Sequence, residues 1–314
     1  MILYVLKRLS AVIPIVVVVS FLIFLLISLA PGDPARAIGG PDASEESLTQ
    51  IRQEYHLNKP LFVQYWYWLS SAVQLDLGNS RSSRLSVAQG IAERFPVTLG
   101  LVILAILIAV AIAIPIGLIS AARAGSRTDG ALSTLMGLAL AVPNFVLAIA
   151  FVIIIGLELR WLPMSGYVAF SDDPVGWLEH MLLPAIAIAA LLLAVLGRQL
   201  RASMIDTLQQ NYVRAAWARG SSSMRVVGLH GLRNAAIPAV TILGVQAATL
   251  LGSTVLVEQI FALPGLGSYL LSAVLAGDIP VIQGVVLVFV IAQVLSSLAV
   301  DIGYGFLNPK LRVV

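Results

Sequence analysis

The sequence predicts an all-α membrane protein with six transmembrane helices, and two observations support this. Of its 314 residues, 59% are hydrophobic and only 11% are charged, whereas soluble globular proteins carry roughly 25% charged residues. In addition, six segments provide the run of about 20 mostly apolar residues that crosses a bilayer. These segments are residues 9–30, 97–121, 131–157, 181–197, 236–257 and 281–303.

The charges of the loops predict the orientation of the chain. Lysine and arginine gather at both termini and in the second and fourth loops, and the fourth loop, residues 198–235, has several arginines against the single acid Asp206. The fifth loop has only acids, Glu258 and Asp278. Because cytoplasmic loops carry the excess of basic residues, both termini are expected in the cytoplasm. The same rule accounts for the net charge of +3, so we expect no nucleic-acid partner.

The composition excludes several kinds of chemistry. The chain has no cysteine, which excludes disulfides, thiolate catalysis and cysteine-ligated metals. Its three histidines are scattered, so no metal centre is expected, and no constellation for an intramembrane enzyme is present. None of the lysines follows a glycine, so the chain has no P-loop for ATP. We therefore expect no catalytic residue and no cofactor bound by this chain.

The first apolar segment, residues 9–30, is expected to stay in the membrane, because it lacks a small-residue cleavage site followed by a soluble domain. The sequence Pro-Gly-Asp-Pro at residues 31–34 is expected to end this helix abruptly. Residues 31–96 then form an external loop. Its aromatic run at residues 65–68 is expected to belong to a small helical cap and to serve packing and interface anchoring.

Prolines inside the second and third segments indicate bends. Pro115 lies in the second segment, and Pro143 precedes Asn144 in the third. A proline inside a span frees a carbonyl group that neighbouring helices or side chains must satisfy. These bends are explained equally well by hinges in a moving core and by simple packing.

Polar side chains inside the last two segments are candidates for the lining of a translocation path. Buried polar groups in a membrane are costly and usually face a bundle interior or a water-filled path. The alternative is hydrogen bonding between helices. With Asn144 of the third segment, the candidates for the path or its gate are Gln246, Thr249, Ser253, Glu258, Gln293 and Ser297; among them Glu258, near the outer end, is the candidate for an outer gate.

The fourth loop contains a basic, amphipathic segment. At helical spacing, Leu208, Tyr212, Ala215 and Ala216 fall on one stripe, and Arg214 lies on the opposite side. A glycine then follows at position 220, where a helix would stop. The segment therefore predicts a short knob that leaves the membrane and is gripped by a second protein. An ordinary loop helix lying on the bilayer is the alternative.

Several motifs at matching spacing resemble one family. Residues 214–220, RAAWARG, resemble the EAA motif, E-A-A-x-x-x-G, of ABC-transporter permeases, with Arg214 in place of the glutamate. The tracts at residues 257–267 and 278–284 and the chain end at residues 300–312 resemble further motifs of the dipeptide/oligopeptide/nickel importer branch. The chain is thus similar to these permeases over essentially its whole length.

This resemblance implies a type I ABC importer permease fold with a small extracytoplasmic insertion. It implies a multi-pass subunit of the bacterial inner membrane that forms half of a path for di- and oligopeptides. The implied partners are a second, homologous permease subunit in a heterodimer, two ATP-binding cassette subunits that hold ATP and Mg, and an extracytoplasmic substrate-binding protein. The residues implied in coupling to the ATPase, on a helix of about residues 207–219 and the turn after it, are Tyr212, Arg214, Ala215, Ala216, Arg219 and Gly220.

The expected domains are residues 1–30, the N-terminal tail and first helix; 31–96, the insertion; and 97–314, the permease core with its cytoplasmic coupling loop 198–235. Two alternatives for the function stay open. The substrate could be a nickel chelate or glutathione, since similar permeases handle these. In a different class, the chain could be a self-sufficient channel or ion-coupled carrier, which often has an internal repeat or paired intramembrane acids.

Overall fold

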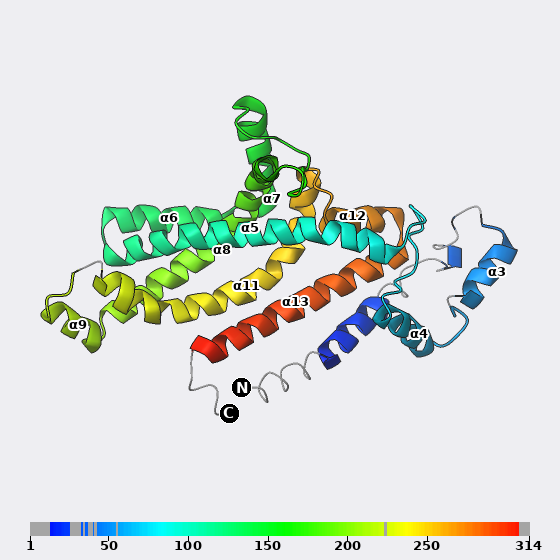
Figure 1. Ribbon diagram of the computed structural model, residues 1–314, viewed down its shortest axis with the longest axis horizontal. Coiled ribbons are helices and arrows are strands. Elements are labelled where there is room, and N and C mark those ends of the chain that lie inside the picture. The colour runs from blue at the N-terminus through cyan, green and yellow to red at the C-terminus, as the bar shows by residue number, and fades with distance from the viewer. Residues whose placement is uncertain are drawn as a thin grey trace. The chain divides into compact units, whose positions relative to one another are not determined.

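The computed structural model describes residues 13–25, 33, 35–36, 40, 43–54, 56–222 and 225–307, without the side chains of residues 229–230, 247–248 and 299–307. This part of the chain is helical and has no strand, only an isolated bridge between Asn79 and Ser86. It is therefore all-α, as predicted (Figure 1). The helices, with η marking π-helices, are Ile13–Leu25, α3 (Glu45–Glu54), α4 (Leu61–Val73), α5 (Val87–Ala122), α6 (Arg127–Ala141), α7 (Asn144–Phe151), η1 (Val152–Glu158), α8 (Pro174–Leu208), α9 (Asn211–Ala218), η2 (Val226–Gly231), α11 (Leu232–Ile260), α12 (Leu266–Ala276) and α13 (Ile279–Leu307).

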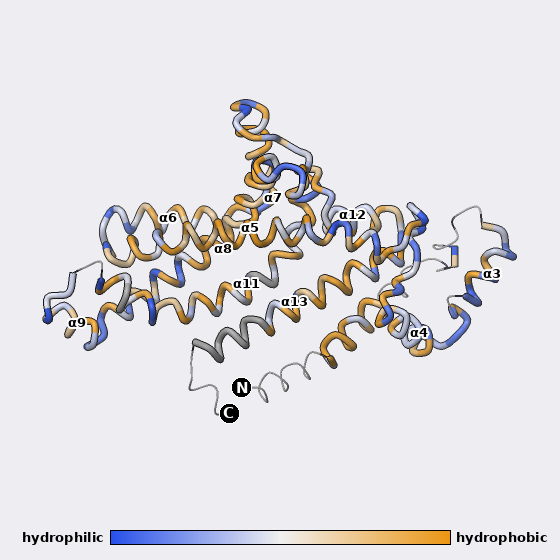
Figure 2. Tube along the Cα trace, in the orientation of Figure 1, coloured by the Kyte–Doolittle hydropathy of each residue, from blue (hydrophilic) through white to orange (hydrophobic). Residues whose placement is uncertain are grey.

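Several of these helices are long and apolar enough to cross a membrane. Within the described residues there are four such helices, or up to five spans if one bent pair counts as a single span. The four are Val87–Ala122, Pro174–Leu208, Val226–Gln246 and Ile279–Leu298, and Figure 2 shows hydrophobic residues along most of α5 and α8. Of the first predicted segment, residues 9–30, the structure describes the apolar helix Ile13–Leu25, and the prolines at 31 and 34 lie outside the described residues.

The third predicted segment, residues 131–157, is not one continuous helix. It forms α6 and then α7 with η1, and the two parts meet at an angle of 98°. The bend lies where sequence analysis expected one, at Pro143. Because a residue before proline is pushed out of the helical region, Val142 is extended, with φ −94° and ψ 120°. Pro115, by contrast, lies inside α5 without ending it.

The chain forms two compact units. The first unit combines residues 1–98 with residues 264–295. Its core joins the start of α5 to α12 and α13, and it explains why α5 begins before the predicted start at residue 97. The turns at residues 87–96 read as a loop because they carry charges, but Val87 and Ile91 are buried on their inner side. The buried residues of this core are Val87, Ile91, Leu266, Ala273, Val281 and Val285.

The aromatic run of the insertion divides between burial and exposure. Tyr65 of α4 is 4% exposed, and its hydroxyl group lies 2.9 Å from the carbonyl oxygen of Val17 and 2.8 Å from the hydroxyl of Ser20. Trp66 and Tyr67, in contrast, are exposed. The ring of Trp68 packs against the rings of Phe24 and Tyr65, with centroids 6.0 and 6.1 Å away, so the expected packing is observed for Tyr65 and Trp68.

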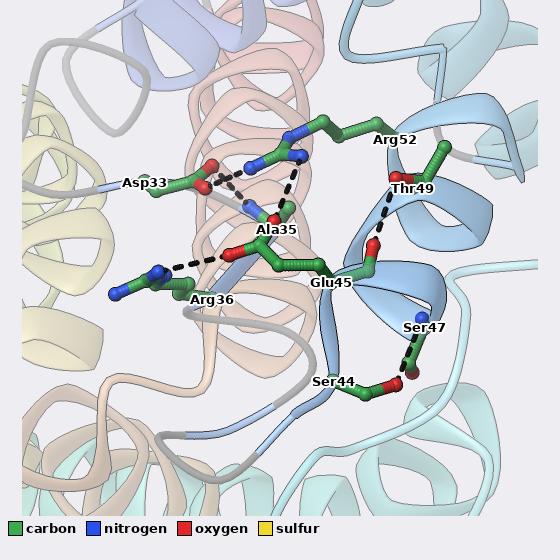
Figure 3. A network of polar contacts seen from close by, with 8 residues as sticks. All are labelled: Asp33, Ala35, Arg36, Ser44, Glu45, Ser47, Thr49 and Arg52. Atoms are coloured by element: carbon green, nitrogen blue, oxygen red, sulfur yellow. Dashed lines mark hydrogen bonds and ion pairs between the residues drawn. The ribbon is translucent and has the colours of Figure 1, made fainter.

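Two polar networks also stabilise the first unit. Near α3, Arg52 donates to Asp33 over 2.6 Å, and Glu45 accepts from Arg36 (Figure 3). In the second network, Asp278, at the start of α13, is 1% exposed. Its Oδ2 atom accepts from the Ser80 hydroxyl at 2.7 Å and from the Ser82 amide at 3.1 Å, which holds the loop before α5.

The second unit, residues 99–263 with 296–314, is built around α8. This helix contacts α6, α7 and α11 and buries residues along most of its length. Small residues permit close approach: a Cβ atom at Gly197 of α8 would lie 2.7 Å from the sulfur of Met136 in α6. Likewise, a Cβ atom at Gly117 of α5 would lie 3.0 Å from the side chain of Leu200. Such small-residue contacts are typical of helices that pack within a membrane.

Candidate functional site

The short helix α9 is held to the second unit by one face. Val213 and Ala216 are 0% and 1% exposed and form a buried cluster with Val226 of η2, against which Leu208 also packs. The buried face of α9 is thus not the stripe of Leu208, Tyr212, Ala215 and Ala216 that helical spacing gives, because Tyr212 is exposed and Val213 is buried. The cause is the end of α8 at Leu208: the chain turns before α9 begins, so one helical phase does not run through both helices.

The predicted end of this helix at Gly220 is confirmed. Gly220 has φ +77°, a backbone conformation that glycine adopts without steric cost. Its amide donates to the carbonyl of Trp217 at 2.9 Å, and the amide of Ser221 donates to the carbonyl of Ala216 at 3.2 Å. These two bonds make a Schellman motif, which satisfies the last carbonyl groups of a helix. The glycine is thus required by the turn that closes α9.

The other face of α9 is open and mixed in character. Tyr212 and Trp217 are each 44% exposed, and Arg214, Ala215 and Arg219 are exposed as well. Hydrophilic residues gather in the segment around α9 (Figure 2). Aromatic and arginine side chains at an exposed surface are the residue types that dominate protein–protein contacts. Four of the six residues predicted to couple to the ATPase, with Trp217, therefore share this exposed surface; Ala216 anchors α9, and the exposed Gly220 closes it.

A hydrogen bond ties this exposed face to α11. The side-chain amide of Asn234 donates to the Tyr212 hydroxyl over 2.7 Å. Asn234 lies in the first turn of α11, a helix that continues to Ile260. The helix α9 is consequently joined to α8 and η2 by apolar contacts and to α11 by a polar one.

Sequence reasoning missed a buried ion pair between α6 and α8. The carboxylate of Asp129, 6% exposed, accepts from Arg201 Nε at 2.6 Å and from Arg201 Nη2 at 2.7 Å. It also accepts from the Ser120 hydroxyl and, at 2.9 Å, from the Gly125 amide. Its own amide donates to Ser126, the N-cap of α6. The signal in the sequence was a lone acid, three residues after a serine, in a loop that is otherwise basic.

The predicted path residues converge only in part. The side-chain amide of Asn144 in α7 donates to the carbonyl of Ser253 in α11 over 3.3 Å, so these two are brought together. The hydroxyls of Ser253 and Thr249 donate to the carbonyls of Leu250 and Gln246 within α11. Such local bonds satisfy a hydroxyl group without a water-filled path.

The remaining path candidates differ in their exposure. Glu258, the expected outer gate, is 0% exposed. Gln293 and Ser297 are exposed on α13. Among the residues that the structure describes, no three histidine, aspartate or glutamate side chains lie close enough together to hold a metal ion.

Comparison with known families gives two matches that together span most of the chain. The family described as "Binding-protein-dependent transport system inner membrane component" matches residues 113–313. Its N-terminal counterpart, "Binding-prot-dependent transport system membrane comp, N-term", matches residues 1–102.

The chain is also similar along its whole length to curated proteins. A candidate peptide transport system permease protein of Brucella abortus (strain 2308) is 41% identical over 308 residues, 98% of each chain. The glutathione transport system permease protein GsiC of Escherichia coli (strain K12) is 40% identical over 309 residues, again 98% of each chain.

Proposed function

The chain belongs to the family of binding-protein-dependent transport system inner membrane components, and we propose that it is one permease subunit of an ATP-driven importer of di- and oligopeptides. In this proposal six transmembrane helices cross the bacterial inner membrane with both termini in the cytoplasm. Residues 31–96 lie outside as an insertion, and residues 97–314 form the core. A second, homologous permease subunit completes the translocation path, of which this chain supplies half.

The observation that carries the proposal is the construction of α9. Two buried side chains and a closed C-terminus fix this helix, while Tyr212, Trp217 and two arginines are exposed. A chain without a P-loop needs partners for ATP hydrolysis, and α9 offers them a surface within the basic loop 198–235. We propose that one of two ATP-binding subunits, which hold ATP and Mg, grips this surface.

The mechanism follows from how α9 is attached. When the ATPase subunits close, the one on α9 displaces it. Because Leu208 joins α9 to the end of α8 and Asn234 joins it to α11, both helices receive the displacement. Such a push changes the population of inward- and outward-facing states only if it acts differently on the two. An extracytoplasmic binding protein delivers the peptide to the outward-facing state.

The proposed substrate class is short peptides. One relative is named for peptide transport and another for glutathione transport, at 41% and 40% identity. Glutathione is itself a tripeptide, so both names describe the same chemical class. Nickel chelates, the other substrate of the branch, are the alternative. Uptake of labelled dipeptide, tripeptide and glutathione by the reconstituted complex, each in competition with the others and with a nickel chelate, would rank them.

A charge reversal on α9 tests the coupling role. Arg219→Glu in the reconstituted importer is expected to lower both peptide uptake and the ATP hydrolysis that the loaded binding protein stimulates. Arg225→Glu reverses an exposed arginine outside α9 and serves as the matched control. Uptake and hydrolysis that are unchanged by Arg219→Glu would refute coupling through this surface.

A second experiment separates the importer from a self-sufficient channel or carrier. The purified chain alone, in liposomes, is expected to give no peptide or ion flux. Flux that needs neither partner subunits nor ATP would overturn the proposed function.

A further inference from the structure

The ion pair between Asp129 and Arg201 lies close to the attachment of α9 without being part of it. Arg201 is on α8, between two buried neighbours, Leu200 and Met204, of a cluster that also contains Ala121 of α5. Leu208 packs against this cluster and also against the cluster under α9. The guanidinium of Arg201 is therefore attached to the same stretch of α8 that supports α9.

The other partner of the pair controls the first turn of α6. Asp129 accepts two bonds from Arg201 and one from the amide of Gly125, and its own amide donates to Ser126. The turn between α5 and α6 and the start of α6 are thus fixed to one position on α8. A bidentate arginine–carboxylate contact is directional, because both bonds must be made in one plane.

Stability alone does not explain why a charged pair, and not an apolar one, joins α6 to α8. Removing two ions from water is costly, and an apolar pair of similar volume often holds two helices at least as well. The Asp129 side chain is 6% exposed and the Arg201 side chain 30% exposed, so the pair is largely removed from water, and its two-pronged contact fixes one register of α6 on α8. Such a contact transmits a shift of α8 to α6 as long as both partners are present.

The series of contacts continues from α6 to α7 and α11 within the second unit. After α6 the chain bends by 98° into α7, where the side chain of Asn144 donates to the carbonyl of Ser253 in α11. Because the two axes are nearly perpendicular, a displacement along the axis of α6 would act across the axis of α7. Contacts therefore run from α9 through α8 and α6 to α7, and they end at two residues that are candidates for the translocation path.

We propose that the Asp129–Arg201 ion pair is a positioning contact that transmits the displacement of α9 from α8 to α6 and α7. This inference rests on the proposed function, because it presumes that α9 is moved by an ATPase. The pair touches neither substrate nor nucleotide. Its two side chains act by keeping α6 in register with α8 during that movement.

The experiment measures ATP hydrolysis and peptide uptake in the complete reconstituted importer. Asp129→Asn and Arg201→Gln are each expected to lower the stimulation of ATP hydrolysis by loaded binding protein about two- to thirty-fold, the range that side chains along a coupling network typically give. The concentration of binding protein that gives half-maximal stimulation is expected to stay the same. A merely structural defect would instead reduce the amount of assembled complex and leave each assembled molecule fully coupled.

A charge swap and a matched control complete the design. The double variant Asp129→Arg with Arg201→Asp is expected to recover only part of the stimulation that either single swap removes, because it restores the ion pair but not the bonds that the carboxylate accepts from Ser120 and Gly125. Arg198→Gln removes an exposed arginine one turn earlier on α8 and is expected to leave the stimulation unchanged. Wild-type stimulation and uptake in assembled Asp129→Asn and Arg201→Gln complexes would overturn the proposal.

Two further outcomes also test the proposal: variants that do not assemble, and a wild-type complex that shows no stimulation. If the neutral variants do not assemble, Arg201→Lys keeps the charge and loses the two-pronged contact, so full stimulation in that variant would also overturn the proposal. If the wild-type complex itself shows no stimulation by loaded binding protein, the proposed function fails. Failure of the ion-pair proposal alone is recognised by a wild-type complex that is stimulated and variants that equal it.

Discussion

Replacement of Gly220 is the most direct test of how α9 is held. A Cβ atom at this position would meet nothing within 4 Å, so crowding adds no cost. The backbone has φ +77°, and the left-handed region costs a residue with a Cβ atom about 1–2 kcal/mol. Proline cannot adopt this φ and also removes the amide that donates to Trp217, a further loss of about 0.5–1.5 kcal/mol.

These energies are large relative to what holds α9 in place. A helix of eight residues is not stable by itself in water, so its C-terminal motif and its two buried side chains must maintain it. A loss of 1–2 kcal/mol lowers the ratio of docked to undocked α9 by a factor of about 5–30. Gly220→Ala is therefore expected to weaken co-purification of the ATPase subunits with the permease, and Gly220→Pro to abolish it.

Two controls make the result specific to α9. Gly78 has the same φ of +77° but lies in the first unit, so Gly78→Ala imposes the same backbone strain far along the chain from α9 and is expected to leave ATPase binding intact. Gly220→Asn should be milder than Gly220→Ala, because asparagine tolerates the left-handed region. Hydrogen exchange of residues 211–222 reports whether α9 is docked. A Gly220→Pro subunit that keeps its ATPase partners and its exchange protection would refute this reasoning.

Three other predictions concern the anchor of α9 and the first unit. Ala216→Leu overfills a site that is 1% exposed, at a cost of about 1–3 kcal/mol, and should raise hydrogen exchange in α9; Ala215→Leu on the exposed face should not, and equal exchange in both would contradict the assigned anchor. Asp278→Ala removes the acceptor that holds the loop before α5, a loss of about 1.5–3 kcal/mol that should speed tryptic cleavage at residues 81–84; an unchanged rate would contradict it. The hydrogen bond from Arg52 lowers the pKa of Asp33, so this half-buried pair contributes up to about 1 kcal/mol of stability at pH values above the ordinary aspartate pKa near 4. The contribution is lost as the pH falls through the lowered pKa of Asp33. Arg52→Gln should remove this part of the pH dependence of protease resistance in the insertion, and an identical pH profile would argue against the pair.

Local chemistry explains which features could be predicted from the sequence. The end of α9 at Gly220 was predictable because a positive φ is a property of one residue and its immediate neighbours. The bend at Pro143 was predictable for the same reason. Its size of 98° was not, because the contacts of α7 with α8 and α11 set the direction in which the chain leaves the bend.

Features that depend on contacts between distant residues could not be predicted from the sequence. The stripe of Leu208, Tyr212, Ala215 and Ala216 does not coincide with the buried face of α9, because one helical period does not continue across the turn after Leu208. The anchor Val213 is instead selected by contact with Val226 in η2. The pairing of Asp129 with Arg201 joins residues that lie far apart in the chain. A basic loop offers Asp129 several possible arginines, and only the approach of α6 to α8 decides among them.

The two backbone bonds that close α9 have a consequence for how a partner can use it. Because the carbonyl groups of Ala216 and Trp217 accept from the chain's own amides at Ser221 and Gly220, these two peptide groups stay hydrogen-bonded when a partner leaves. The helix can thus be released and recaptured in the same shape. In the proposed importer, this allows an ATPase subunit to bind and release α9 in every turnover while the helix stays folded.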